Sequence, residues 1–148
     1  MTMDKYPQLR LENQLCFPLY ACSKEIVRRY TPFLDPLGLT YTQYLVMMVM
    51  WEKESINIKE LGEMLFLDSG TLTPVVKKLE SKGLLERKRC PQDERCVILT
   101  LLPAGYALAD EAAAIPEKMG GCVCLSKGEA QALYASLYKI LGGFCEEK

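Results

Sequence analysis

Residues 57–101, NIKELGEMLFLDSGTLTPVVKKLESKGLLERKRCPQDERCVILTL, are the stretch that decides the fold. Asn57 is a favoured N-cap and predicts a short helix over residues 58–65. A second helix is predicted over residues 69–82, and Gly83 after it is typical of a left-handed C-cap. Two short helices joined by a tight turn make a helix-turn-helix pattern.

A β-hairpin is predicted directly after these helices. Residues 84–90 and 95–101 are predicted strands, and the polar residues 91–94 between them favour a turn. A helix-turn-helix followed by such a hairpin is a winged helix. Residues 69–96 carry seven Lys or Arg and four Asp or Glu, although the whole chain has a net charge of −1. This local positive charge is typical of a surface that faces nucleic acid, and a solvated charged helix and hairpin is the alternative.

A long helix is predicted before this unit, over residues 11–30, because leucines recur there every four residues. Asn13 is a favoured N-cap, which puts Cys16 in the first turn. Pro18 fits this position because proline is tolerated near the start of a helix. Pro32 marks the expected end or kink.

Three more helices are predicted from caps and apolar patterns. Residues 40–43 form a capping box, and the apolar run YLVMMVMW at 44–51 indicates a helix that is buried all round. An Ala-rich helix is predicted over 103–115 and is ended by Pro116, although Leu102 is a poor cap for it. Ser126 and Glu129 form the capping box of the last helix, which runs to about Phe144.

The predicted class is mainly α: a winged helix-turn-helix with flanking dimerisation helices. We expect one domain over residues 1–148, with a DNA-binding winged unit at about 56–101. The helices at about 11–35 and 103–145 are the expected dimerisation helices. A lone winged helix does not need such long apolar helices, and pairing with a second copy is their natural use.

Composition excludes several classes of function. The chain has no histidine, which removes mixed Cys/His zinc sites, histidine acid–base catalysis and Ser/His or Cys/His nucleophile pairs. Its seven cysteines are an odd number, and a disulfide scaffold is not expected. No apolar run approaches the roughly 18 residues of a membrane span, and residues 1–15 lack a secretion-signal pattern. We therefore expect a cytoplasmic protein without membrane contact, metal or cofactor.

Cys16 is the candidate reactive residue. Unpaired backbone N–H groups and the positive end of the helix dipole favour a thiolate in a first turn, and such thiolates are reactive. Tyr20, four residues on, lies on the same helix face. We therefore expect Cys16 to sense an oxidant. The alternative is a buried core cysteine, which is a common place for a free thiol.

Several motifs resemble the multiple-antibiotic-resistance regulator family. LLER at 84–87, DER at 93–95 and PAG at 103–105 are similar to its wing signature, and the order of elements agrees over nearly the whole chain. A closer likeness is to the organic-hydroperoxide-resistance regulators within that family. The segments that carry it are NQLCF at 13–17, LGLTY at 37–41, QYLVM at 43–47 and DSGTLTP at 68–74. Leu102, where a Thr cap is usual, and Pro18 depart from the pattern.

The resemblance implies a dimeric repressor in which Cys16 is the peroxide sensor. It also implies that Tyr30 and Tyr41 hydrogen-bond to Cys16 from the partner subunit. The spacing agrees, because Cys16 and Tyr30 are 14 residues apart, about 21 Å on one straight helix. They cannot meet within one chain unless the helix breaks, and they can meet between two antiparallel copies.

The expected mechanism starts when an organic hydroperoxide converts Cys16 to a sulfenic acid. A second thiol then forms a disulfide, and the two winged units lose the spacing that fits DNA. The candidate resolving thiols are Cys122 and Cys124, in a Gly-rich link, and a low-molecular-weight thiol is the alternative. This Cys-x-Cys pair offers too few ligands for a soft metal. The remaining cysteines are expected to be structural or incidental: Cys22, Cys90, Cys96 and Cys145.

The expected DNA partner is a pseudo-palindromic double-stranded operator. Hydroxyls contact both phosphates and base edges, and lysine and arginine contact phosphates. Arg95 resembles the minor-groove arginine of the family, and Asp93 is expected to orient it through a salt bridge. The other candidate DNA contacts are Ser69, Thr71, Thr73 and Lys77 on the second helix of the pattern and Arg87, Lys88 and Arg89 on the hairpin.

Two other functions stay open. A regulator of the same fold is released by a small aromatic ligand, and insensitivity to dithiothreitol would identify it. A thiol peroxidase is the rival enzyme. The chain lacks the alternating strands and helices of a thioredoxin-like fold and any Cys-x-x-Cys, so an enzyme is not expected.

Overall fold

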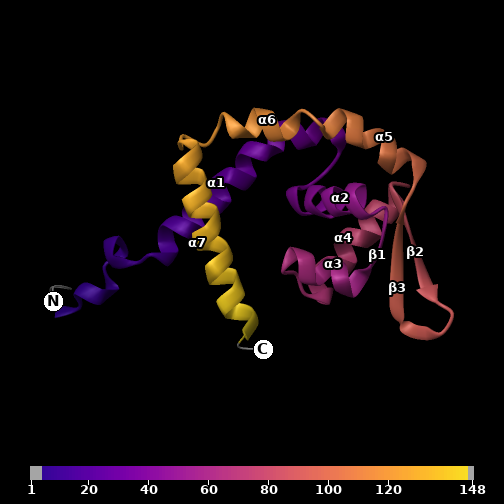
Figure 1. Ribbon diagram of the computed structural model, residues 1–148, viewed down its shortest axis with the longest axis horizontal. Helices are drawn as coiled ribbons and strands as arrows, with labels where there is room; N and C mark the ends of the chain where they lie inside the picture. The colour runs from indigo at the N-terminus through magenta and orange to yellow at the C-terminus, as the bar shows by residue number, and fades with distance from the viewer. Residues whose placement is uncertain (1–4, 147–148) are drawn as a thin grey trace. The chain divides into compact units, whose positions relative to one another are not determined.

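The computed structural model describes residues 5–146, and the fold is mainly α, as predicted (Figure 1). Its contacts form two compact units, one up to Ile115 and one from Pro116 on, so the single domain expected over 1–148 stays a prediction. Among the described residues, no helix is long and apolar enough to cross a membrane. The elements are η2 (Pro7–Leu9), η3 (Leu11–Asn13), α1 (Cys16–Leu34), η4 (Asp35–Leu37), α2 (Tyr41–Lys53), β1 (Ser55–Asn57), α3 (Ile58–Leu65), α4 (Ser69–Ser81), β2 (Leu85–Cys90), β3 (Asp93–Leu101), α5 (Pro103–Ala112), α6 (Ile115–Gly120) and α7 (Lys127–Glu146).

The winged helix is present, with α3 and α4 as the helix-turn-helix and β2–β3 as the wing (Figure 1). Asn57 caps α3 by accepting the backbone N–H of Lys59, and Asp68 caps α4 by accepting that of Thr71. Gly83 after α4 has a φ of +71°, the left-handed conformation that glycine adopts without strain. These caps depend on residues two or three positions apart, which is why local sequence predicts them.

The sheet has one strand that the sequence analysis did not predict. It contains β1, β3 and β2 in that order, and both pairs are antiparallel. Leu99 pairs with Ile56 of β1 on one side and with Arg87 of β2 on the other. β1 has three residues and carries one apolar side chain, so it lacks a recognisable alternating pattern. Its contribution is to place the start of α3 beside the wing.

The core of this first unit forms around α2. Thr40 and Gln43 make the predicted capping box, with backbone N–H to side-chain distances of 3.1 and 3.3 Å. Gln43 is buried, and its Oε1 also accepts from Lys82 at the end of α4. The indole N–H of Trp51 donates to the carbonyl oxygen of Gly105 at 2.8 Å, which fastens α2 to α5. Buried side chains of these helices and the sheet complete the core: Leu34, Tyr44, Val46, Met47, Met50, Leu61, Leu72, Val76, Leu79, Leu85 and Leu99.

The first helix begins later than predicted. Asn13 is not its N-cap, because Asn13 Nδ2 donates to the Pro7 carbonyl oxygen at 2.8 Å and α1 starts at Cys16. Pro18 explains the late start, since a helix continued back to Gln14 would press the Gln14 carbonyl against the proline ring. Gln14 has extended backbone angles instead, with φ −105° and ψ 106°. Cys16 is therefore the first residue of α1.

Two helix ends differ from the prediction at prolines. α1 continues past Pro32 to Leu34, so the hydrogen bond that proline cannot donate does not end the helix. α5 ends at Ala112, and Pro116 belongs to the start of α6, where proline is tolerated. A proline in the sequence therefore does not identify the residue at which a helix ends.

Candidate redox site and DNA-binding surface

Cys16 is exposed on the first turn of α1. Tyr20, one turn later, is also exposed, and the Lys24 ammonium lies 5.1 Å from its ring centroid. Leu15 and Phe17 beside the cysteine are exposed too, with 73% and 43% of their surfaces accessible. The alternative of a cysteine buried in the core of its own subunit is therefore wrong.

Tyr30 and Tyr41 come together between α1 and α2. Their ring centroids are 4.8 Å apart, and Tyr44 lies 5.8 Å from Tyr30 on the other side. Burial raises the pKa of the Tyr30 phenol above its ordinary value. The pKa of the Tyr41 phenol is also raised, mainly by burial and to a smaller extent by the neighbouring Tyr30. Both phenols therefore keep their protons at neutral pH and are available as hydrogen-bond donors.

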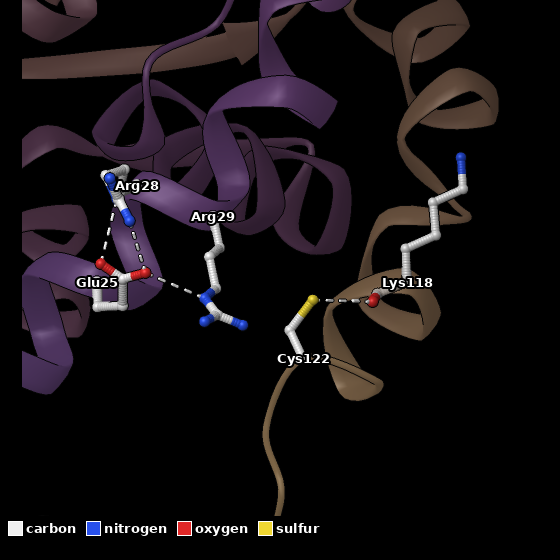
Figure 2. Close-up of polar contacts among 5 residues, drawn as sticks. All are labelled: Glu25, Arg28, Arg29, Lys118 and Cys122. Carbon is white, nitrogen blue, oxygen red and sulfur yellow. Dashed lines mark hydrogen bonds and ion pairs between the residues drawn. The ribbon is translucent and has the colours of Figure 1, made fainter.

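One continuous helix separates Cys16 from Tyr30. α1 runs without a break from Cys16 to Leu34, so the 14-residue spacing corresponds to about 21 Å along the helix axis. Between these two residues, the carboxylate of Glu25 accepts from Arg28 at 3.0 and 3.1 Å and from Arg29 at 3.3 Å (Figure 2). These pairs join neighbouring turns of the helix surface. Cys16 does not reach the tyrosine pair within its own α1.

Cys122 and Cys124 lie in the irregular segment between α6 and α7. The thiol of Cys122 is half-buried and donates to the carbonyl oxygen of Lys118 at 3.6 Å, as Figure 2 shows. Cys124 is exposed. The two candidate resolving thiols thus differ in accessibility. Ser126 and Glu129 directly after them form the predicted capping box of α7.

The helix α4 carries four of the predicted DNA contacts. Ser69, Thr71 and Lys77 are exposed, whereas Thr73 is half-buried. The Thr71 hydroxyl donates to Asp68 at 3.2 Å. Backbone and hydroxyl hydrogen bonds from Thr71 lower the pKa of the Asp68 carboxyl, which keeps this cap charged at neutral pH.

Two arginines of the wing that are predicted DNA contacts differ in their surroundings. Arg87 is half-buried and pairs with Glu80 of α4, with 2.7 Å between Nε and Oε2. This contact attaches the wing to α4 and lowers the pKa of the Glu80 carboxyl. Arg95 is exposed near the tip. Asp93 accepts the backbone N–H of Arg95 at 2.9 Å, so it shapes the turn, whereas a salt bridge to the guanidinium was expected.

Cys90 and Cys96 form a disulfide across the wing, with their Cα atoms 5.4 Å apart. This bond was not predicted from the sequence, because seven cysteines allow many pairings. The signal that points to it is the hairpin itself, since the pairing of Arg89 with Val97 brings the neighbouring Cys90 and Cys96 close together across the two strands. No cluster of three His, Cys, Asp or Glu that suits a metal ion occurs within residues 5–146.

The helix-turn-helix, its basic outer face and the wing define a winged-helix DNA-binding protein. Residues 39–97 match the MarR family. The chain is 44% identical to the organic hydroperoxide resistance transcriptional regulator of Bacillus subtilis (strain 168), over 93% of this chain and 94% of that protein. The chain belongs to the MarR family, in its subfamily of organic hydroperoxide resistance regulators.

Solved structures of AbfR, a Staphylococcus epidermidis protein, share this fold. Reduced AbfR bound to DNA is 35% identical, with a TM-score of 0.76, and the match covers 95% of this chain and 99% of AbfR. Disulfide-formed AbfR is 34% identical, with a TM-score of 0.62, over 96% of this chain and 97% of that one.

Proposed function

We propose that this protein is a homodimeric repressor that binds operator DNA and releases it when an organic hydroperoxide oxidises Cys16. The observation that carries the proposal is an exposed cysteine at one end of α1 and a phenol pair, Tyr30 and Tyr41, near the other. Two antiparallel copies of α1 bring the cysteine of each subunit to the phenols of its partner. The relative from Bacillus subtilis, whose name states organic hydroperoxide resistance and transcriptional regulation, supports the same signal.

Exposed apolar side chains support the dimer. Leu15 directly before α1 and Phe17 and Ile26 of α1 are exposed. In the second unit, α7 exposes Leu133, Tyr138, Phe144 and further apolar side chains along its length. Exposed apolar area of this extent on one chain is typical of an interface, because its burial against a second copy stabilises the pair. The flanking helices are the proposed dimerisation elements.

The chemistry at Cys16 is a two-electron oxidation. The thiolate attacks the O–O bond of the hydroperoxide, the sulfur gains a hydroxyl group as a sulfenic acid, and the other oxygen leaves and is protonated to the alcohol. Neutral phenols at Tyr30 and Tyr41 of the partner donate hydrogen bonds to the charged thiolate and lose this arrangement when the sulfur carries oxygen. A second thiol then displaces water from the sulfenic acid and forms a disulfide.

DNA recognition uses the outer face of α4 and the wing. In helix-turn-helix dimers the second helix enters the major groove, and the two half-sites are about one helical turn apart. The exposed Ser69, Thr71 and Lys77 then face the groove and its phosphates, and Arg95 at the wing tip reaches the next groove. The structure of AbfR bound to DNA, which has the same fold, supports this mode of docking.

The test is DNA binding to the region upstream of the protein's own gene, measured by mobility shift with and without cumene hydroperoxide. We expect the parent protein to release DNA and dithiothreitol to restore binding, while Cys16→Ser stays bound. Cys22→Ser is the matched control, since Cys22 is an exposed cysteine of the same helix. Release that persists in Cys16→Ser contradicts the proposal. Release by a phenolic acid that dithiothreitol does not reverse identifies the regulator that responds to a small aromatic ligand.

A further inference from the structure

The wing contains a thiol pair that the sensor chemistry at Cys16 does not use. Cys90 ends β2 and Cys96 lies in β3, six positions later, and the two sulfurs are bonded. Arg89 pairs with Val97, but the next β2 residue, Cys90, pairs with Asp93. Residues 94–96 of β3 therefore form a bulge. The ring that the disulfide closes contains the hairpin turn and this bulge, including Arg95.

The sulfur of Cys96 is also connected to the helix-turn-helix. Asn57 Nδ2 donates to Cys96 Sγ at 3.2 Å, while Asn57 Oδ1 accepts the backbone N–H of Lys59 at 2.8 Å. One amide side chain thus contacts the wing sulfur and caps α3. A change at Cys96 acts on the bulge that carries Arg95 and on the first turn of α3.

The surroundings of the two cysteines suit thiol chemistry. Both are half-buried, and the residues between them, 91–95, are exposed, so small oxidants and reductants reach the sulfurs from the wing tip.

We propose that Cys90 and Cys96 are a second oxidation site, a dithiol that organic hydroperoxide converts to the wing disulfide independently of Cys16. One thiolate attacks the O–O bond, which gives a sulfenic acid and the alcohol. The other thiol displaces water from that sulfenic acid, so two thiols and one hydroperoxide become one disulfide, one alcohol and one water. A dithiol reductant such as dithiothreitol reverses the reaction by exchange and becomes oxidised itself.

The disulfide form of the wing binds DNA more tightly than the dithiol form. The closed ring restricts the hairpin tip before binding, so less conformational freedom is lost when Arg95 enters a groove. We expect a difference of about two- to tenfold in Kd, the range that corresponds to ordering one side chain. This direction is opposite to that of Cys16 oxidation. The effect on DNA rests on the proposed function, whereas the thiol chemistry does not.

Tryptic peptides of the chain show directly whether the wing disulfide has formed. Trypsin cleaves after Arg89 and Arg95, so the two cysteines fall in separate peptides, 90–95 and 96–118, which the disulfide holds together. The full-length Cys16→Ser protein is reduced, treated with tert-butyl hydroperoxide, alkylated and digested. We expect the linked pair of peptides to form with hydroperoxide and to disappear with dithiothreitol. Alkylated cysteine in both peptides at every dose overturns the proposal.

DNA affinity is then measured on the same Cys16→Ser protein with the wing reduced or oxidised, and on Cys16→Ser with Cys90→Ser and Cys96→Ser added. We expect tighter binding after oxidation in the first protein and no change in the second. Equal affinity of the two wing states overturns the regulatory part. A different result would contradict the proposed function, namely that hydroperoxide still causes the Cys16→Ser protein to release DNA.

Discussion

Tyr30 of α1 and Tyr41 of α2 lie ring to ring, with 4.8 Å between their centroids. The contact joins the helix that begins with Cys16 to the buried helix at the centre of the first unit. A change at the phenols therefore acts on the packing of α1 against α2. Substitutions at this pair can therefore distinguish the packing of the rings from the hydrogen bonds of their hydroxyl groups.

Tyr30→Phe and Tyr41→Phe keep the rings and remove the hydroxyl groups. We expect each variant to need more hydroperoxide for DNA release, since the thiolate of the partner loses a charge-assisted hydrogen bond worth about 1.5–3 kcal/mol. The free energy of unfolding should change little. Tyr44→Phe is the matched control, because Tyr44 lies 5.8 Å from Tyr30 in the same ring cluster. If both variants release DNA at the same hydroperoxide concentration as the parent protein, the two tyrosines are not part of the sensor.

Glu80→Gln removes the ion pair that attaches Arg87 of the wing to α4. The pKa of Glu80 is lowered by Arg87, so the stabilisation is present above the ordinary pKa of about 4.5 and is lost as pH falls below it. At pH 7 we expect the variant to be less stable by about 0.2–1 kcal/mol, as is typical of an accessible pair. Urea unfolding at pH 7 and at pH 3 checks this. A difference that is as large at pH 3 would assign the effect to something other than the charge.

Gly105→Ala tests the close approach of α5 to the hairpin. A Cβ at Gly105 would overlap the Leu84 carbonyl oxygen and the Leu101 side chain. We expect a loss of about 1–3 kcal/mol, the usual cost of overpacking. Gly128→Ala on α7 is the control, because no atom lies within 4 Å of its added Cβ, and it should be neutral or slightly stabilising. Thermal unfolding compares the two, and equal melting temperatures would contradict the predicted overlap.

Arg95→Ala and Lys77→Ala test the wing and the recognition helix separately. Each phosphate contact that is removed lowers the slope of log affinity against log salt concentration by about one unit. Lys139→Ala, an exposed position of α7, is the charge-matched control. Fluorescence anisotropy over a range of salt concentrations gives the slopes. Unchanged binding by Arg95→Ala at every salt concentration would argue against the wing as a DNA contact.

Cys124→Ser and Cys122→Ser test the resolving thiol. We expect Cys124→Ser to lose more of the cross-linked dimer that hydroperoxide produces, because Cys124 is exposed while Cys122 is half-buried and hydrogen-bonded to Lys118. Non-reducing electrophoresis measures the cross-link. A parent protein without a cross-linked dimer would leave a low-molecular-weight thiol as the resolving partner.

Local sequence predicted the winged helix well, because its signals act over a few residues. The caps at Thr40, Asn57 and Ser126 and the left-handed Gly83 all occur as expected. Prolines were less informative. Pro32 lies inside α1 and does not end it, and Pro116 lies in the first turn of α6, where a missing N–H is tolerated.

Two side-chain contacts could not be predicted from the sequence. Asn13 donates to Pro7 and does not cap α1, and Asn57 contacts Cys96, which is 39 positions away. Neither partner could be chosen from composition or spacing, since several polar or sulfur groups compete for each. The three-residue β1 exists because β3 is already present to pair with it.

The sequence by itself determined the helix-turn-helix and the wing, the family and the position of Cys16 near a helix start, since each depends on patterns within a few residues. Only the tertiary structure decided that Tyr30 meets Tyr41, that Cys90 bonds to Cys96 and that Arg87 pairs with Glu80. The physical reason is chain folding: packing of a helix on a helix and closure of the wing select one partner among many that the linear chain allows.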